Sequence, residues 1–146
     1  MAKLARDVMT VNPACCTPET PIDQVAKLMV QHDCGEIPVI DPAEHVVGVV
    51  TDRDIVCRVV AQERNPMAYT AETCMTESVV TVTTDSPLSE VMATMERHQV
   101  RRVPVVDEQG CCAGMISQAD VAWAGKERDV AELVREVSRE TGRSSK

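Results

Sequence analysis

Two short segments of the chain share one polar pattern: a glycine, two apolar residues, a hydroxyl residue and, three positions after the hydroxyl, an aspartate. The segments are residues 48–54 and residues 114–120. A hydroxyl residue followed three positions later by an acid is a capping box, which stabilises a helix start without any ligand. A strand that ends at a helix N-terminus also presents backbone amides and a positive dipole end, which suit phosphate or a polar ligand. The pattern predicts a strand-to-helix turn and leaves both interpretations open.

The hydroxyl and carboxylate of each segment are the groups that could hold a ribose. Thr51 with Asp54, and Ser117 with Asp120, combine a carboxylate that accepts two hydrogen bonds with a hydroxyl that donates or accepts. The glycine that opens each segment would leave room for the ligand to approach the backbone. The sequence therefore predicts two comparable places where a vicinal diol could bind.

A proline interrupts a predicted strand in each half of the chain. Pro38 and Pro104 lack the N–H group that would complete the hydrogen-bond ladder. Backbone groups left unpaired nearby could bind the edge of a base. An edge strand that tolerates proline is an equally good explanation.

An internal repeat organises the chain, because residues recur at a constant spacing of 66 positions. Met9 recurs as Met75 and Gly48 recurs as Gly114. The register holds without a gap, so the chain is predicted to contain two copies of one supersecondary unit. The segment that joins them contains Asn65-Pro66, which is a turn signal.

Each copy is predicted to run strand, helix, strand, strand, helix, in an α/β or α+β fold. Thr20-Pro21 and Ser86-Pro87 predict helix starts, with the hydroxyl residue as N-cap and the proline as first helical residue. Apolar residues follow each proline at helical spacing. The predicted strands cover residues 14–17, 37–41 and 46–51 and residues 79–83, 102–107 and 112–117, and second helices open at residues 52 and 118.

The composition excludes several classes of protein. The net charge is −8 at pH 7, which repels nucleic acid and anionic membranes. With no Phe, one Trp and one Tyr, the chain lacks the aromatic platforms on which RNA-binding and single-strand-binding folds stack bases. The core is predicted to be aliphatic. Apolar runs are too short for a membrane span and no signal peptide is evident, so we expect a cytoplasmic protein with reduced thiols.

These motifs together resemble a known family. In each copy Met-Thr is followed by Thr-Pro or Ser-Pro, then by IPVID or VPVVD, then by GVVTDRD or GMISQAD. This series is similar to a tandem pair of cystathionine-beta-synthase (CBS) domains, also called a Bateman module, over about residues 5–123. The resemblance implies two βαββα repeats packed with pseudo-twofold symmetry, clefts between the copies and frequent homodimers. It assigns residues 1–62 to repeat 1, 63–73 to a linker, 74–125 to repeat 2 and 126–146 to a C-terminal helix and tail.

The resemblance also implies ligands and the residues that contact them. The family commonly binds adenosine compounds such as AMP, ADP, ATP and S-adenosylmethionine, and sometimes nicotinamide or cyclic dinucleotides. By position, the ribose would be held by Thr51 with Asp54 and by Ser117 with Asp120. Adenine would contact residues 34–38 and 100–104, and phosphate would meet arginines. The expected ligand-binding set is completed by Cys34, Glu36, Ile37, Pro38, Val100, Val103, Pro104, Thr17, Thr83, Arg101, Arg102 and, more weakly supported, Arg53.

The two copies differ in charge at these positions. Gly35-Glu36 of the first copy corresponds to Arg101-Arg102 of the second. A carboxylate close to phosphate is unfavourable, whereas a guanidinium matches phosphate geometry. We therefore expect unequal sites, one occupied strongly and the other weakly.

The remaining polar residues suggest other functions. The seven cysteines include the adjacent pairs Cys15-Cys16 and Cys111-Cys112, which do not have the spacing of a zinc site. We expect Cys15, Cys34 and Cys57 to be buried as small apolar residues and Cys111 to be exposed and oxidisable. His32 and His98 are expected at helix ends, where they favour the helix dipole.

The sequence therefore favours a stand-alone, non-enzymatic sensor without a catalytic cofactor or metal. It would bind AMP, or ADP, ATP or NAD(H), as a regulatory ligand and signal to an unidentified protein effector by conformational change. A redox-responsive or metal-responsive module that uses the cysteines is one alternative. A structural dimerisation module without a ligand is another. An unrecognised nucleotide hydrolase is the least favoured, because no catalytic motif is present.

Overall fold

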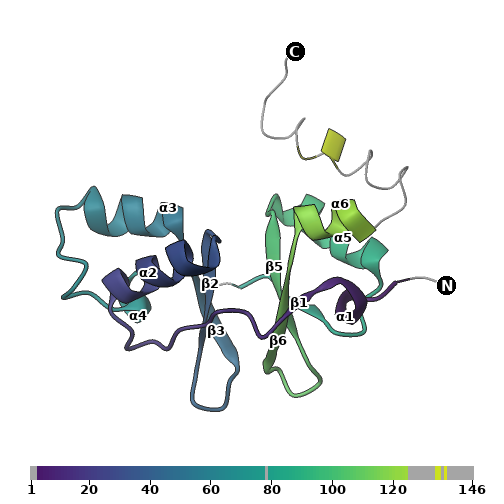
Figure 1. The fold of residues 1–146 in the computed structure, drawn as a ribbon, viewed down its shortest axis with the longest axis horizontal. Helices are drawn as coiled ribbons and strands as arrows, with labels where there is room; N and C mark the ends of the chain where they lie inside the picture. Colours follow the sequence, from purple (N-terminus) through teal and green to yellow (C-terminus); the bar gives the residue numbers. More distant parts are fainter. Residues whose placement is uncertain (1–2, 78, 125–133, 136, 138–146) are drawn as a thin grey trace. The chain divides into compact units, whose positions relative to one another are not determined.

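The computed structural model describes residues 3–77, 79–124, 134–135 and 137. They fall into two compact units (Figure 1). The first-repeat unit contains Asn12–Val79 and Gln109–Cys112. The second-repeat unit contains the described parts of Met1–Val11, Val80–Glu108 and Ala113–Lys146.

The first-repeat unit is built on an antiparallel hairpin with helices packed against it. Its elements are α2 (Ile22–His32), β2 (Glu36–Ile40), β3 (Val46–Thr51), α3 (Asp52–Ile55), the π-helix η1 (Val56–Val60) and α4 (Ala71–Cys74). In the hairpin, Glu36 pairs with Thr51 and Pro38 pairs with Val49. The N-terminal end of β2 therefore lies beside the C-terminal end of β3.

The second-repeat unit contains a four-stranded sheet in the order β1-β6-β5-β4. Its elements are α1 (Ala5–Val8), β1 (Thr10–Val11), β4 (Val82–Thr83), α5 (Leu88–His98), β5 (Arg102–Val106), β6 (Cys112–Ser117) and α6 (Gln118–Ala124). Strand β4 is parallel to β5, and β1 is antiparallel to β6. The two units together confirm the predicted α+β class.

Each unit has its own aliphatic core, as the composition predicted. Helix α2 and strands β2 and β3 provide most of the first core, and α5, β5 and β6 provide most of the second. Valine is common in both cores because its branched side chain fits the pleated surface of a strand. The fully buried residues include Ile22, Val25, Ile37, Val39, Val50 and Val59 in the first unit and Val91, Met95, Val103, Val105, Ile116 and Val121 in the second.

In each unit a Met-Thr segment packs against a strand glycine, which is Gly48 of β3 in the first-repeat unit and Gly114 of β6 in the second. Thr76 exchanges backbone hydrogen bonds with Val49, at 2.8 and 3.0 Å. A Cβ atom on Gly48 would lie 2.5 Å from the Met75 Sδ atom, so this side of the glycine is filled. Our expectation that the glycines leave room for a ligand is wrong, because their space is taken by protein.

In the second-repeat unit the same role belongs to Met9 and Thr10. Thr10 pairs with Met115, and a Cβ atom on Gly114 would lie 2.5 Å from Met9 Sδ and 2.8 Å from the Thr10 carbonyl oxygen. The start of the chain therefore packs with the second repeat, while the Met-Thr segment that follows the joining segment packs with the first.

The predicted helix starts need one correction. Pro21 and Pro87 are themselves the N-caps, with extended backbone at ψ 148° and 150°. The hydroxyls of Thr20 and Ser86 instead accept hydrogen bonds from the backbone N–H groups of Thr17 and Thr83, each at 3.0 Å. They close the turn before the helix, so they do not cap the helix. The predicted ends at His32 and His98 are confirmed.

The predicted first strand of each copy is shorter than expected. Residues 14–17 contribute one parallel bridge, between Cys16 and Val39, and residues 79–83 contribute only β4. Pro38 lies in an edge strand, and its carbonyl oxygen accepts a hydrogen bond from the Cys16 N–H at 3.0 Å. The edge explanation is wrong for Pro104, because β5 lies between β6 and β4. Pairing with β4 begins at Val105, one residue after this proline.

The predicted C-terminal helix lies mostly outside the described residues. Residues 134, 135 and 137 are helical, and Val137 packs against the core of the second-repeat unit. Among the described residues, no helix is both long enough and apolar enough to cross a membrane.

Adding a methyl group at the two strand glycines is expected to destabilise the protein by different amounts. Gly114→Ala would place Cβ 2.8 Å from a backbone oxygen, whereas Gly48→Ala would place Cβ 3.1 Å from one. Overpacking costs roughly 1–3 kcal/mol, and we expect Gly114→Ala to cost more because a backbone atom must move. Urea unfolding followed by circular dichroism measures both.

Removal of the neighbouring methionine side chain separates the two contributions. Met75→Ala should restore part of the stability lost in Gly48→Ala, because the closest contact there is to the methionine sulfur. Met9→Ala should restore less in Gly114→Ala, since the Thr10 carbonyl oxygen remains in place. Equal stability of both alanine variants and the wild-type protein would contradict this account.

Alkaline pH is expected to weaken the first core through Cys16. This side chain is 5% exposed, and burial raises its pKa from 9.0 to about 12, with a smaller contribution from Cys74. A thiol whose pKa is higher in the folded state stabilises that state below pH about 9 and loses this effect as pH rises toward about 12. The free energy of unfolding should fall over this range less steeply in Cys16→Ala than in the wild-type protein. An unchanged slope in Cys16→Ala would contradict this account.

Candidate functional site

The first polar motif forms a turn in which β3 ends and α3 begins. Thr51 Oγ1 accepts a hydrogen bond from the Asp54 N–H at 3.0 Å, and Asp54 Oδ2 accepts one from the Thr51 N–H at 3.0 Å. Both bonds of a capping box are present, so this prediction is confirmed. Asp54 is only 9% exposed although it carries a carboxylate.

The second motif forms an equivalent turn between β6 and α6. Ser117 Oγ accepts from the Asp120 N–H at 3.1 Å, and Asp120 Oδ2 accepts from the Ser117 N–H at 2.9 Å. Both side chains are half-buried. The two repeats therefore present the same hydroxyl and carboxylate in the same local geometry.

The predicted adenine-contacting stretches lie beside these turns within each unit. The Gly35 carbonyl oxygen accepts a hydrogen bond from the Asp52 N–H at 3.0 Å, which joins residues 34–38 to the start of α3. The Arg101 carbonyl oxygen accepts one from the Gln118 N–H at 2.7 Å, which joins residues 100–104 to the start of α6. The structure thus brings together residues from distant predicted segments.

Not all side chains of these stretches are accessible. The buried ones are Ile37, Pro38, Val103 and Pro104, and the half-buried ones are Cys34, Glu36, Val100 and Arg102. A ligand at the turns would therefore meet the half-buried side chains first. Arg53 and Arg101 are exposed, so their guanidinium groups are available to an anion.

Thr17 and Thr83 lie away from the capping box of their own unit. Thr83 pairs with Val106, the last residue of β5, whereas the Ser117 turn adjoins the start of β5. The preceding neighbour of Thr17, Cys16, bridges Val39 near the end of β2. Both threonines are exposed, and their hydroxyls lie 3.0 Å from those of Thr20 and Ser86.

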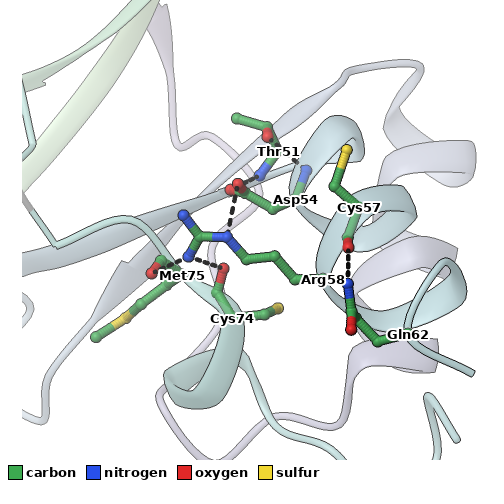
Figure 2. A network of polar contacts seen from close by, with 7 residues as sticks. All are labelled: Thr51, Asp54, Cys57, Arg58, Gln62, Cys74 and Met75. Carbon is green, nitrogen blue, oxygen red and sulfur yellow. Dashed lines mark hydrogen bonds and ion pairs between the residues drawn. The ribbon is translucent and has the colours of Figure 1, made fainter. Parts of the chain in front are cut away.

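Arg58 is a residue of this region that the sequence reasoning missed. Its Nε atom lies 3.8 Å from Asp54 Oδ1, and its Nη1 atom donates to the carbonyl oxygens of Cys74 and Met75 at 3.3 Å (Figure 2). It connects the acidic residue to the segment that packs over Gly48. One feature of the sequence could have predicted this contact: Arg58 stands four residues after Asp54, and side chains at this spacing on a helix lie close together. Ala124 stands at the corresponding place in the second repeat, so this connection is specific to the first.

The structure corrects the expected exposure of four cysteines. Cys15 and Cys34, which were expected to be buried, are half-buried. Cys57 is exposed, because only Val59 of η1 is turned into the core. Cys111 is half-buried, and its thiol donates to the Ala43 carbonyl oxygen at 3.3 Å. Within the part of the chain that the structure describes, no group of three or more His, Cys, Asp or Glu residues could hold a metal ion.

The capping boxes are expected to contribute to stability independently of any ligand. Thr51→Ala and Asp54→Ala should each lower the free energy of unfolding by about 1 kcal/mol, because a backbone N–H at the helix start loses its partner. Asp52→Ala, in the same helical turn and exposed, is the matched control. Thermal unfolding measures all three, and equal losses for Asp52→Ala and Asp54→Ala would contradict the assignment.

Comparison with known proteins identifies the repeat. The family model of the CBS domain matches residues 5–61 and again residues 71–127. Hypoxic response protein 1 of Mycobacterium tuberculosis is 32% identical over 133 residues, which cover 91% of this chain and 92% of that protein. The sequence likeness therefore extends over nearly the whole of both proteins.

Solved structures share the fold. Hypoxic Response Protein I, crystallised with two coordinated zinc ions, has a TM-score of 0.79 at 31% identity and covers 85% of this chain and 100% of that one. The CBS domain pair of protein MJ0100, in complex with 5′-methylthioadenosine and S-adenosyl-L-methionine, has a TM-score of 0.75 at 27% identity over 84% and 95%. CBSX2 of Arabidopsis thaliana, in complex with AMP, has a TM-score of 0.73 at 25% identity over 90% and 98%.

The family match, the duplicated capping box and the shared fold agree with one another. Each match to the family model contains one complete turn of the kind described above. The chain therefore belongs to the CBS-domain family and carries two CBS domains in tandem.

Proposed function

We propose that this protein is a regulatory module that binds an adenosine compound, with AMP favoured, at the strand-to-helix turns of its repeats. Ligand binding would alter its conformation, and a protein effector would respond to the change. CBS-domain pairs are generally regulatory and not catalytic. The complexes of MJ0100 and CBSX2 support an adenosine ligand, because both of those related proteins hold one.

The observation that carries the proposal is the unused bonding capacity of the capping box. Asp54 uses Oδ2 for the Thr51 N–H, while Oδ1 lies 3.8 Å from Arg58 Nε, too far for a hydrogen bond. Thr51 Oγ1 accepts the Asp54 N–H, so its own hydroxyl proton can be donated to a ligand. A ribose diol would supply the two donors and acceptors that match these groups.

Charge differences make the repeats unequal in this proposal. Arg101 precedes β5 and Arg102 begins it, whereas Glu36 begins the corresponding strand β2. A phosphate near the second repeat would be attracted to the guanidinium groups, and a phosphate near Glu36 would be repelled. We expect the second repeat to prefer a phosphorylated ligand such as AMP, ADP, ATP or NAD(H).

Isothermal titration of nucleotide-free protein with AMP, ADP, ATP, NADH and S-adenosylmethionine tests the proposal. Asp54→Ala or Asp120→Ala should weaken binding at its own repeat roughly ten- to a hundredfold, because a hydrogen bond to a charged group contributes about 1.5–3 kcal/mol. Asp52→Ala should leave affinity unchanged.

Controls separate a lost site from a lost fold. Circular dichroism and thermal unfolding of each variant must show a folded protein, because Asp54 and Asp120 also cap helices. Thr51→Ser keeps the hydroxyl and should retain binding, whereas Thr51→Val removes it. The adenosine proposal fails if folded wild-type protein binds none of these compounds, or if Asp54→Ala and Asp120→Ala both bind with wild-type affinity.

Other functions remain distinguishable from this one. One relative is named L-aspartate semialdehyde sulfurtransferase, but this chain covers only 22% of that protein. Product formation from ATP or NAD over time would show catalysis and contradict the regulatory proposal. We also propose that the protein acts in the cytoplasm as a homodimer and that it signals to a protein effector, which is not identified. A dimer that shows no ligand binding would favour a purely structural module.

A further inference from the structure

Two cysteines that lie far apart in the sequence meet within the first-repeat unit. The Sγ atoms of Cys15 and Cys112 are 4.0 Å apart although 97 positions separate the residues. Both side chains are half-buried, so small reagents can reach them while the protein is folded.

The backbone on both sides of the pair is held in place. The Cys112 N–H donates to the Glu44 carbonyl oxygen at 2.9 Å, and neighbouring Cys111 bridges His45. On the other side, Cys16 exchanges backbone hydrogen bonds with β2, donating to the Pro38 carbonyl oxygen at 3.0 Å. The proximity of the two sulfurs is therefore a consequence of the fold.

We propose that Cys15 and Cys112 are a redox-modifiable pair that closes to an intramolecular disulfide. A disulfide requires an S–S distance of about 2.05 Å, so the sulfurs must approach each other by roughly 2 Å. Rotation of the two side chains about χ1 can supply much of this movement. The inference does not depend on nucleotide binding.

The hydrogen-bond arrangement suggests which sulfur reacts first. The Cys15 thiol points to the Cys112 sulfur, and this contact, together with burial, raises the pKa of Cys15 well above its usual range. Cys15 therefore keeps its proton and donates it towards the Cys112 sulfur. The thiolate is the nucleophile in disulfide exchange, so Cys112 is the attacking sulfur.

The oxidant is a low-molecular-weight disulfide such as oxidised glutathione. The Cys112 thiolate attacks one sulfur, forms a mixed disulfide and releases one glutathione thiolate. Cys15 then loses its proton to water and attacks the Cys112 sulfur, which breaks the mixed disulfide and releases the second glutathione thiolate. The protein loses two electrons and two protons, and two molecules of glutathione are formed.

Four of the other five cysteines are poor competitors for this reaction. Cys16 and Cys74 are 5% and 2% exposed, and burial raises the pKa of both. A bond between adjacent residues, as in Cys111-Cys112, would be strained because its geometry departs from that of ordinary disulfides. Exposed Cys57 has no sulfur partner among the contacts described above, so it would form mixed disulfides only.

The proposal is tested on the full chain, reduced and then equilibrated with oxidised glutathione. After acid quenching and alkylation with N-ethylmaleimide, intact mass spectrometry should show a species that has lost two reactive thiols and the mass of two hydrogen atoms. A second species should carry the same change together with one glutathione on exposed Cys57. Cys15→Ser and Cys112→Ser should each abolish the loss of two hydrogen atoms. Cys57→Ser should retain it, because Cys57 is exposed and makes none of the sulfur contacts described above.

Peptide mapping of the wild-type protein assigns the bond without relying on variants that fold poorly. Trypsin releases residues 7–27 and 103–126, each of which contains two adjacent cysteines. Cys111→Ser leaves Cys112 as the one cysteine of the second peptide, and fragmentation spectra distinguish Cys15 from Cys16. The oxidised form should unfold at a temperature higher by about 5 °C or more, because the bond closes a long loop.

Several results would overturn the inference. These are retention of all thiols at a high ratio of oxidised to reduced glutathione, a bond that joins any other two cysteines, and a cross-link between two chains on a non-reducing gel. An intramolecular bond that persists in Cys112→Ser would do so as well.

Discussion

The close approach of a Met-Thr backbone to a strand glycine determines how each unit is assembled. The Thr10 carbonyl oxygen would lie 2.8 Å from a Cβ on Gly114, and the Thr76 carbonyl oxygen 3.1 Å from one on Gly48. The 2.8 Å distance is shorter than Cβ atoms show, and at Gly48 a Cβ would also lie 2.5 Å from the Met75 Sδ atom. The glycine of each unit therefore lets the Met-Thr segment dock this closely. Because Met9-Thr10 docks on the second repeat and Met75-Thr76 on the first, each compact unit contains chain from beyond its own repeat.

The strand-to-helix turn combines a structural and a chemical role in the same two side chains. The Thr51 hydroxyl and the Asp54 carboxylate each bond a backbone N–H of the turn, and this fixes their positions before any ligand arrives. Preorganised groups bind more tightly because less conformational freedom is lost on binding. The capping-box and ribose-binding interpretations are therefore compatible. A side chain that caps a helix with one oxygen retains a second acceptor.

Differences between the repeats are concentrated around this shared turn. Arg58 links Asp54 to the Cys74 and Met75 carbonyl oxygens, and the second repeat has Ala124 instead. Glu36 and Arg102 carry opposite charges at corresponding positions. The two repeats share the geometry of this turn and differ in the charges around it. The Cys15–Cys112 contact adds a further difference, since both sulfurs lie in the first-repeat unit.

The sequence by itself determined the repeat, the fold class, the long helices, the central strands and the capping boxes. These features depend on the spacing of residues along the chain and on side chains three or four residues apart. They can therefore be predicted from the order of the residues alone. Tertiary structure decided which segments meet: the docking of Met75-Thr76 over Gly48, the reach of Arg58 to Cys74, and the approach of Cys15 to Cys112. It also moved the hydroxyls of Thr20 and Ser86 from helix caps to the preceding turns. Contacts between residues distant in sequence depend on the packing of whole elements, and no local pattern records that packing.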